Sequence, residues 1–255
     1  MKSKLKNILN DWVPGTVMFS TWLKGHYEIT DQDLQGYKKR GWVKALSPGV
    51  FVRPKDKVEW LGALSSLQTQ LHFNIHVGGI SSLELHGLSQ NLTLGKNRKI
   101  WIYGSPETFL PRWFRQGSWD VKIVYVQSRQ FKDFSLGLST HSFGRYDLIL
   151  SSKERAMFEL VSNIGSQAQL QHAYQHMEAL VTLRPDLVLS LLKSCRILKT
   201  KRLFLYLAEK CNHAWLKEIN LKGIRLGVGK QKIGEGGTYI PKYKISVPSL
   251  EESDA

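Results

Sequence analysis

The chain has 255 residues, of which 42% are hydrophobic, 11% aromatic and 22% charged, so it can bury one or two cores and is not intrinsically disordered. Its 36 Lys and Arg residues outnumber 21 Asp and Glu residues, and the formal charge of +15 favours a polyanionic partner. Two cysteines are too few for a disulfide framework and no apolar run is long enough to span a membrane, so we expect a cytoplasmic protein without membrane contact.

The N-terminal residues 1–57 predict three helices followed by a hairpin. A basic amphipathic helix is expected over residues 2–10, and a short second helix between Thr16 as its N-cap and Gly25 as its C-cap. A third helix is expected over residues 31–40. The two strands of the hairpin are expected at residues 42–46 and 50–53. Three helices and a hairpin in this order are typical of a winged helix-turn-helix domain.

The third helix has two unlike faces. Its start is marked by Thr30 and Asp33, which have the spacing of a capping box. Leu34 and Tyr37 point toward the core, whereas glutamine, lysine and the small Gly36 lie on the opposite face. Glutamine can pair with adenine, lysine can donate to guanine or phosphate, and glycine lets the backbone approach the bases, so this face suits a DNA major groove. The residues predicted to contact DNA from the helix and the wing are Gln32, Gln35, Lys38, Lys39, Arg40, Lys44, Arg53 and Lys55, with Lys57 nearby.

The remainder, residues 58–250, predicts a mixed α/β domain with a helical portion, so that the whole chain is of the α+β class. A subdivision near residue 150 stays open. The middle part is expected to hold a helix at 60–71, an extended piece at 73–77, a brief helix after Gly78, strands at 100–103 and 121–126, and weaker strands at 136–138 and 148–150.

From residue 151 onward the hydrophobic spacing is helical. Ser151 and Glu154 have the spacing of a capping box, Ser166 and Pro185 mark two further helix starts, and Leu203 to Leu207 mark a fourth helix. A β-rich end is expected over residues 219–247. The acidic residues 251–255 are expected to be disordered.

Motifs for catalysis or metal binding are incomplete. The segment Gly227 to Lys230 lacks the first glycine and the final serine or threonine of a phosphate-binding loop. His172 and His176 are four residues apart on a helix, but no third metal ligand is recognisable. We therefore predict no catalytic residue, no metal and no cofactor.

Two alternative functions stay open. Asp120 and Lys122 resemble half of a metal-dependent nuclease site, whose second carboxylate would have to come from Glu84 or Glu107. The winged helix could instead be a protein-interaction adaptor, because that fold also contacts proteins. A further basic cluster, Lys199, Lys201 and Arg202, could present a cationic ridge or pack its aliphatic stems around the neighbouring leucines.

Several segments, in their order along the chain, resemble the AbiEi family of bacterial type IV antitoxins over nearly the full length. They are Gly41-Trp42-Val43, Gly49-Val50-Phe51-Val52-Arg53-Pro54, the Gly78 to Gly87 segment, Pro111-x-Trp113-Phe114, Ser152-x-Glu154-Arg155-Ala156, Leu183-Arg184-Pro185, Lys199-x-Lys201-Arg202-Leu203 and Lys242-Tyr243.

This resemblance implies a transcriptional autorepressor whose winged helix binds inverted repeats in the double-stranded DNA of its own promoter. Whether the protein is a monomer or a dimer, and whether copies bind DNA cooperatively, stays open. It also implies a C-terminal domain that counters a nucleotidyltransferase-like toxin in an abortive-infection system against phages. Antitoxin and toxin would interact functionally rather than as a stable complex. Antitoxic activity would then involve Lys199, Lys201 and Arg202.

Overall fold

The structure, a computed structural model, describes residues 2–88 and 98–250. Its N-terminal part has the order helix, strand, helix, helix and hairpin, and the three strands pair antiparallel in the order β1-β3-β2. This arrangement agrees with the winged helix-turn-helix expected from the sequence. The elements are α1 (Lys2–Asp11), β1 (Met18–Phe19), α2 (Ser20–Tyr27), α3 (Asp31–Lys39), β2 (Lys44–Ser47) and β3 (Val50–Val52).

The prediction of a helix directly after Thr16 is wrong at its start. Met18 pairs with Phe51 and Phe19 with Val50, so these residues form β1, and α2 begins only at Ser20. Gly25 lies within α2 rather than after it, because the left-handed C-cap is Glu28, at φ 52°. Burial of β1 against the sheet outweighs the helical spacing of the same residues.

A mixed sheet of five strands forms the middle part, in the order β6-β5-β4-β8-β7. Pairs β4–β8 and β5–β6 are parallel, whereas β4–β5 and β7–β8 are antiparallel. The strand expected at 136–138 is longer and lies later in the chain. The elements are α4 (Trp60–Gln70), β4 (Ile75–Val77), α5 (Gly79–Leu85), β5 (Lys99–Gly104), α6 (Arg112–Arg115), β6 (Lys122–Gln127), β7 (Leu138–Phe143) and β8 (Tyr146–Ser151).

The C-terminal part combines helices with a small sheet of order β10-β11-β9. Its first helix is capped by Ser152, whose Oγ accepts a hydrogen bond from the Arg155 N–H, so the predicted Ser151–Glu154 capping box is wrong. Glu154 instead pairs with Arg184. The elements are α7 (Lys153–Ser162), α8 (Gln167–Glu178), α9 (Pro185–Ser194), α10 (Leu198–Lys210), α11 (Ala214–Lys217), β9 (Gln231–Lys232), β10 (Thr238–Ile240) and β11 (Ile245–Val247). The predicted disordered tail lies outside the described residues.

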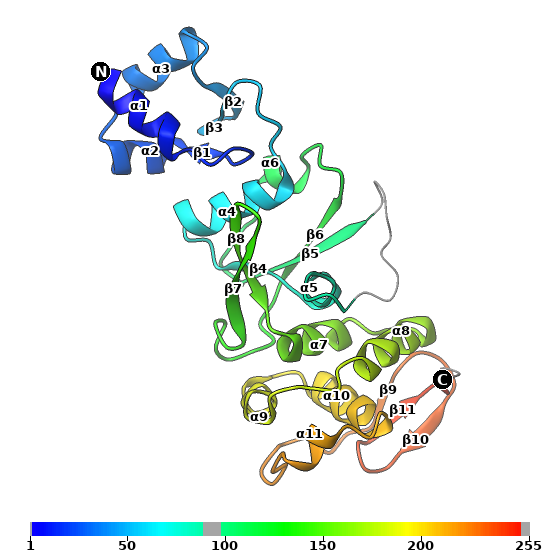
Figure 1. The fold of residues 1–255 in the computed structure, drawn as a ribbon. Helices are drawn as coiled ribbons and strands as arrows, with labels where there is room; N and C mark the ends of the chain where they lie inside the picture. The colour runs from blue at the N-terminus through cyan, green and yellow to red at the C-terminus, as the bar shows by residue number, and fades with distance from the viewer. Residues whose placement is uncertain (1, 89–97, 251–255) are drawn as a thin grey trace.

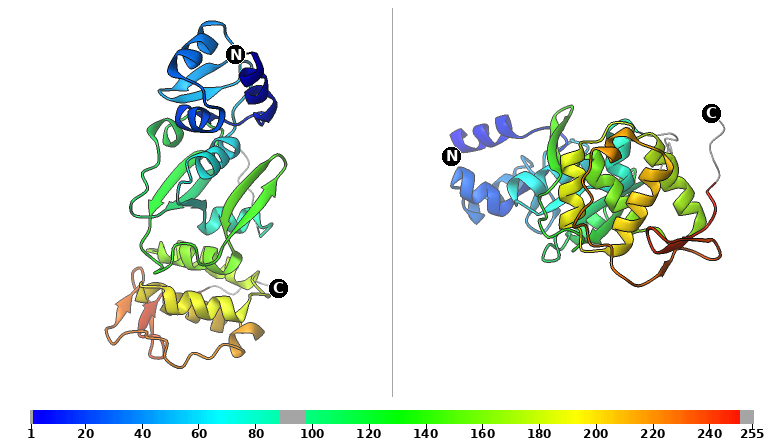
Figure 2. Two further views of the ribbon diagram at one scale, coloured as in Figure 1. Left: turned by 90° about the vertical axis from the view of Figure 1, so that its left-hand side faces the viewer. Right: turned by 90° about the horizontal axis from the view of Figure 1, so that it is seen from below.

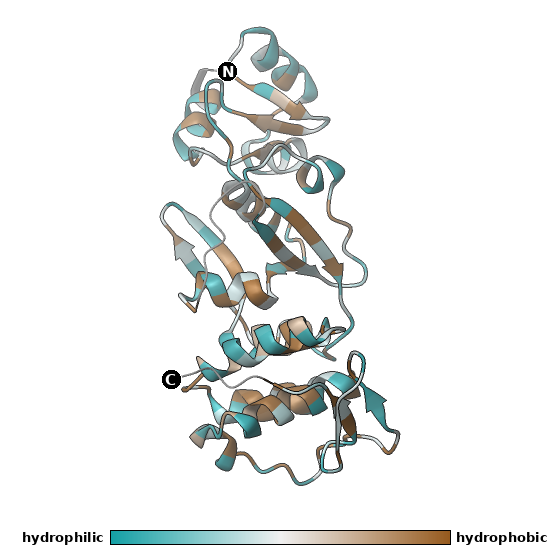
Figure 3. Ribbon diagram, turned by 90° about the vertical axis from the view of Figure 1, so that its right-hand side faces the viewer, coloured by the Kyte–Doolittle hydropathy of each residue, from teal (hydrophilic) through white to brown (hydrophobic). Residues whose placement is uncertain are grey.

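The three parts follow one another along a single long axis (Figures 1 and 2). The winged helix lies at one end, the five-stranded sheet in the middle, and α9 to α11 with the small sheet at the other end. Hydrophobic residues run along the strands of the central sheet (Figure 3). The helix α3 is at the outer end of the molecule, away from the other two parts.

The winged helix and the middle part share a hydrophobic core. Val17 directly before β1, Phe19 of β1, and Val50 and Val52 of β3 are buried in the same cluster as the hydrophobic residues of α4 and the central sheet. A separate, smaller cluster lies among α1, α2 and α3. The expected domain boundary at residue 57 therefore lies between β3 and α4 but divides the hydrophobic core that these two elements share.

Polar side chains of α4 complete the edge of β1. The Ser66 Oγ accepts from the Val17 N–H at 3.2 Å and donates to the Val17 carbonyl at 2.8 Å. The Gln70 side chain accepts from the Phe19 N–H at 3.1 Å and also donates to the Val17 carbonyl at 2.8 Å. These bonds satisfy backbone groups that would otherwise be unpaired at the edge of the sheet, and they hold the winged helix firmly on α4.

Candidate nucleic-acid interface

Both ends of α3 are defined by capping interactions. The predicted capping box is confirmed: the Thr30 Oγ1 accepts from the Asp33 N–H at 3.1 Å, and the Asp33 carboxylate accepts from the Thr30 N–H at 2.9 Å. The hydrogen bonds that the Asp33 carboxylate accepts from the Thr30 N–H and the Thr30 hydroxyl lower the pKa of Asp33. At the other end Gly41, at φ 70°, donates to the Lys38 carbonyl, and Trp42 donates to the Tyr37 carbonyl. This is a Schellman motif, so α3 is fixed in length and direction.

The two faces of α3 differ as the sequence predicts. Leu34 and Tyr37 are 3% and 1% exposed and pack into the N-terminal core. The residues predicted to read DNA from this helix, Gln32, Gln35, Lys38, Lys39 and Arg40, are all exposed.

Gly36 lies on the outer part of the helix with free space around it. A Cβ added there would meet only the Arg40 guanidinium, at 3.7 Å. Packing within the chain therefore does not require a glycine at this position, although glycine weakens a helix. The open space leaves the α3 backbone accessible to a partner.

A groove of about 530 Å³ separates α3 from the hairpin of β2 and β3. Gln35 and Lys38 form its helix side, and Leu46, 46% exposed, lies on the hairpin side. Asp31 also borders this groove, but its carboxylate pairs with Lys24 at 2.6 Å. Asp31 is the only acidic residue among the groove-lining residues that the structure describes, and its ion pair with Lys24 partly neutralises its charge.

The predicted wing residues have different surroundings. Lys44 and Lys55 are exposed. Arg53 is half-buried, and its Nη1 donates to the Trp12 carbonyl at 3.1 Å while its Nε lies 3.7 Å from the Asp56 carboxylate. Arg53 thus ties the end of α1 to the segment after β3. Arg40 adds a cation–π contact with the half-exposed Trp42, at 5.1 Å from the ring centroid.

The basic residues of α10 do not form an exposed ridge. Lys201 and Arg202 are only 7% and 1% exposed, and the Lys199 Nζ donates to the Ile164 carbonyl. The Arg202 guanidinium donates to the carbonyls of Leu226, Gly229 and Lys244 at 2.6 to 3.1 Å. It therefore fixes the glycine-rich loop before β9. The involvement of these three residues in antitoxicity stays a prediction.

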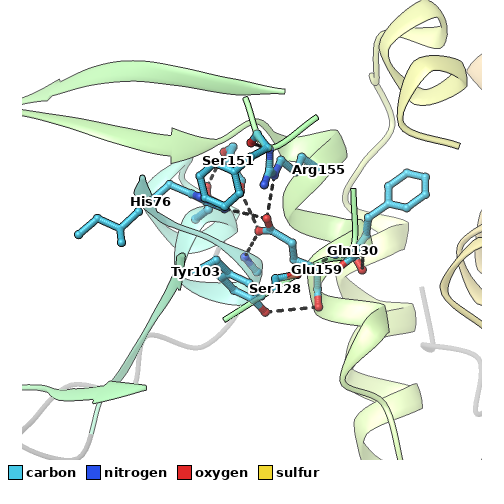
Figure 4. Close-up of polar contacts among 12 residues, drawn as sticks. His76, Tyr103, Ser128, Gln130, Ser151, Arg155 and Glu159 are labelled. Carbon is cyan, nitrogen blue, oxygen red and sulfur yellow. Dashed lines mark hydrogen bonds and ion pairs between the residues drawn. The ribbon is translucent and has the colours of Figure 1, made fainter. Parts of the chain in front are cut away.

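A buried carboxylate cluster was not foreseen from the sequence (Figure 4). Glu159 on α7 bonds to the His76 Nε2, the Arg155 Nε, the Ser151 Oγ and the Gly79 N–H, at 2.7 to 2.9 Å. Burial disfavours its charge, yet His76 and Arg155 hold the pKa of the Glu159 carboxyl well below its ordinary value. The cluster is fully enclosed, so it joins the central sheet to α7 and offers no access to a substrate.

Gly78 is required by this cluster, because a Cβ there would lie 2.2 Å from a Glu159 carboxylate oxygen. The pair Arg155 and Glu159, at helical spacing i, i+4, was a usable sequence signal. The strand residues that complete the cluster come from distant parts of the chain, and no local pattern connects them.

The structure does not assemble the alternative nuclease site. Glu84 pairs with Arg98 at 2.9 Å, and Asp120 and Glu107 are exposed. Residues 2–88 and 98–250 contain no group of three or more His, Cys, Asp or Glu side chains that could hold a metal ion. His172 is exposed, whereas burial lowers the pKa of His176 to about 4. Among the described helices, none combines the length and apolar character needed to cross a bilayer.

Comparison with known proteins identifies the family. Residues 97–248 match the family described as "Transcriptional regulator, AbiEi antitoxin, Type IV TA system", and residues 1–94 match its N-terminal domain, "Transcriptional regulator, AbiEi antitoxin N-terminal domain". The chain belongs to the AbiEi antitoxin family. AbiEi proteins are transcriptional regulators and antitoxins of type IV toxin–antitoxin systems by that description. No curated protein matches the chain.

The fold of this AbiEi chain is similar to that of a solved protein. The crystal structure of the RV2827C protein from Mycobacterium tuberculosis aligns with a TM-score of 0.55 and 13% sequence identity, over 94% of this chain and 88% of that one. At this identity the likeness concerns the fold. The boundary between the two AbiEi family regions, after residue 94, places α4, β4 and α5 with the winged helix, in keeping with the shared core.

Proposed function

We propose that the chain represses its own promoter by binding inverted repeats in double-stranded DNA through α3 and the adjacent wing. The observation that carries this proposal is the outer face of α3: the helix is capped at both ends, and the glutamine and lysine side chains of this face are exposed. A helix of this kind at the end of an elongated molecule can enter a major groove without obstruction from the rest of the chain (Figure 1).

The residues of this face divide into two roles. In this proposal the exposed Gln32 and Gln35 pair with base edges, because glutamine amides match the donor and acceptor pattern of adenine. The exposed Lys38, Lys39 and Lys44 contact phosphates, which supply affinity but little sequence information. Arg53 contributes indirectly, by holding α1 against the segment that follows the wing.

Promoter binding is tested by fluorescence anisotropy with a duplex of the upstream sequence. We expect the Gln35→Ala, Lys39→Ala double variant to bind that duplex about tenfold or more weakly than the unaltered chain. Lys217→Ala, which removes an exposed cation from α11, is the matched control and is expected to bind normally. Equal affinities for the double variant and the control would contradict the site assignment.

Salt dependence separates the two roles. Removing one phosphate-contacting lysine reduces the slope of log affinity against log salt by about 1, whereas removing a base-reading glutamine leaves the slope unchanged and weakens discrimination between sequences. Absence of DNA binding at low salt, together with a copurifying protein, would instead favour the adaptor function.

We further propose that residues 58–250 counter a nucleotidyltransferase-like toxin without forming a stable complex with it. Family membership supports the antitoxin role. Growth rescue is the test: cells expressing the neighbouring nucleotidyltransferase gene should recover when this chain is supplied, and the two proteins should not copurify.

Inverted repeats would bring two copies of this chain onto one operator. Sedimentation with and without DNA measures whether the two copies form a dimer before they bind DNA.

A further inference from the structure

A second pocket, of about 430 Å³, lies between β5, α7 and α8. These elements belong to the middle and C-terminal parts of the molecule, so the pocket is separate from the α3 face (Figure 1). Its size falls in the range of small-molecule sites, and its lining combines apolar side chains with a few polar groups. The proposed DNA contact through α3 and the wing does not use it.

One wall of the pocket comes from alternate positions of β5. Lys99, Trp101 and Tyr103 face the pocket, whereas Ile100 and Ile102 between them are buried in the core on the other side of the sheet. Tyr103 is fixed, because its hydroxyl accepts from the Asn163 amide at 2.9 Å (its position is seen in Figure 4). Trp101 is half-buried and Lys99 is exposed, so solvent reaches part of both side chains.

The opposite wall supplies two amides in fixed orientations. The Asn163 NH₂ donates to the Tyr103 hydroxyl and to the Glu159 carbonyl. The side-chain oxygen of Asn163 is therefore the group that can accept a hydrogen bond from a ligand. The Gln169 carbonyl oxygen accepts from the Gly165 and Ser166 N–H groups, which leaves its NH₂ as the donor. These two lining side chains thus leave a carbonyl oxygen on Asn163 and an NH₂ group on Gln169 for a ligand.

The charged side chain in the described lining is that of Lys99, and this lining contains no aspartate or glutamate. An anionic group is therefore favoured at the opening beside Lys99. A planar ring is favoured against Trp101, since aromatic stacking is the main attraction an indole face offers.

We propose that this pocket binds a purine nucleoside monophosphate. The base would stack on Trp101 with its donor and acceptor edge toward Gln169 and Asn163, and the phosphate would contact Lys99. The volume accommodates one free nucleotide. The pocket is distinct from the proposed promoter-binding surface, because it shares no residue with α3 or the wing.

Isothermal titration of the full-length chain with AMP and with GMP tests the proposal. We expect saturable binding with one site per chain for at least one of them. Adenosine or guanosine, which lack the phosphate, and ribose 5-phosphate, which lacks the base, are each expected to bind about tenfold or more weakly. Equal binding of ribose 5-phosphate would show a non-specific anion effect and overturn the proposal.

Two variants locate the site. Trp101→Ala is expected to lower nucleotide affinity about fivefold or more through lost stacking. Lys99→Glu, at an exposed position, should lower the affinity for the nucleotide more than the affinity for the nucleoside. Phe109→Ala, at a 76% exposed position outside the pocket, is the matched control and should bind normally, and circular dichroism checks that each variant is folded. Absence of binding at millimolar nucleotide, or unchanged affinity in both pocket variants, would overturn the proposal.

Discussion

Replacing Gly36 with alanine separates the stability of α3 from its contact with DNA. Gly36 lies inside the helix, and a Cβ there meets only the end of the flexible Arg40 side chain at 3.7 Å, an ordinary van der Waals distance. Alanine is favoured over glycine inside a helix by about 0.5–1 kcal/mol. We therefore expect Gly36→Ala to raise the free energy of unfolding by that amount in urea titrations.

The same methyl group should weaken DNA binding. If the α3 backbone approaches the base edges at Gly36, an added methyl group prevents that approach and costs about 1–3 kcal/mol, or roughly 5- to 150-fold in affinity. Fluorescence anisotropy with the promoter duplex measures this loss. A variant that is more stable yet binds more weakly would be the signature of a helix seated in the groove.

Gly25→Ala is the matched control. Gly25 also lies inside a helix, α2, and a Cβ there meets no atom within 4 Å, so the stability gain should be the same while DNA affinity is kept. Equal promoter affinity for Gly36→Ala and Gly25→Ala would refute close approach at Gly36. A loss of stability in Gly36→Ala would refute the open surroundings described for this position.

Three further predictions concern the core and its charges. A chain of residues 1–57 alone is expected to give a poorly dispersed NMR spectrum, because it lacks the α4 side of its shared core, whereas residues 1–94 should fold better; a folded 1–57 fragment would contradict this. Glu159→Gln should lower the free energy of unfolding in urea by about 3–5 kcal/mol, since it leaves Arg155 without its buried partner, while Glu235→Gln at an exposed position should have little effect. Stability should also fall on acidification: burial lowers the pKa of His176 from 6.5 to about 4, so its contribution is complete above pH 6.5 and is lost as the pH falls toward 4. Urea midpoints at pH 7 and pH 5 measure this loss, and His176→Gln, which cannot titrate, should show a smaller difference; an equal difference would assign the effect to other groups.

Local signals in the sequence predicted the parts of the candidate interface that depend on local interactions. The cap of α3 follows from the three-residue spacing of Thr30 and Asp33, and its two faces follow from helical periodicity. The α+β class and the order of helices and hairpin were predicted for the same reason. The exposure of Lys38 and Lys39 agrees with a surface that no other element covers.

The features that the sequence could not predict depend on contacts between distant residues. Residues 17–19 fit one turn of a helix, but pairing with β3 and the side chains of Ser66 and Gln70 makes them a strand. Arg202 has an ordinary basic context in the sequence, whereas three carbonyls from residues 24 to 42 positions later surround it. Arg53 likewise gains a structural role from Trp12, which is 41 residues earlier.

Photo-crosslinking from α3 to promoter DNA tests the central claim most directly. A benzophenone attached at position 35, in a Gln35→Cys chain, should crosslink to bases within one half of an inverted repeat, and the same probe in a Lys217→Cys chain should not. Crosslinking confined to position 217, or equal and unpositioned crosslinking from both sites, would show that α3 does not read the promoter.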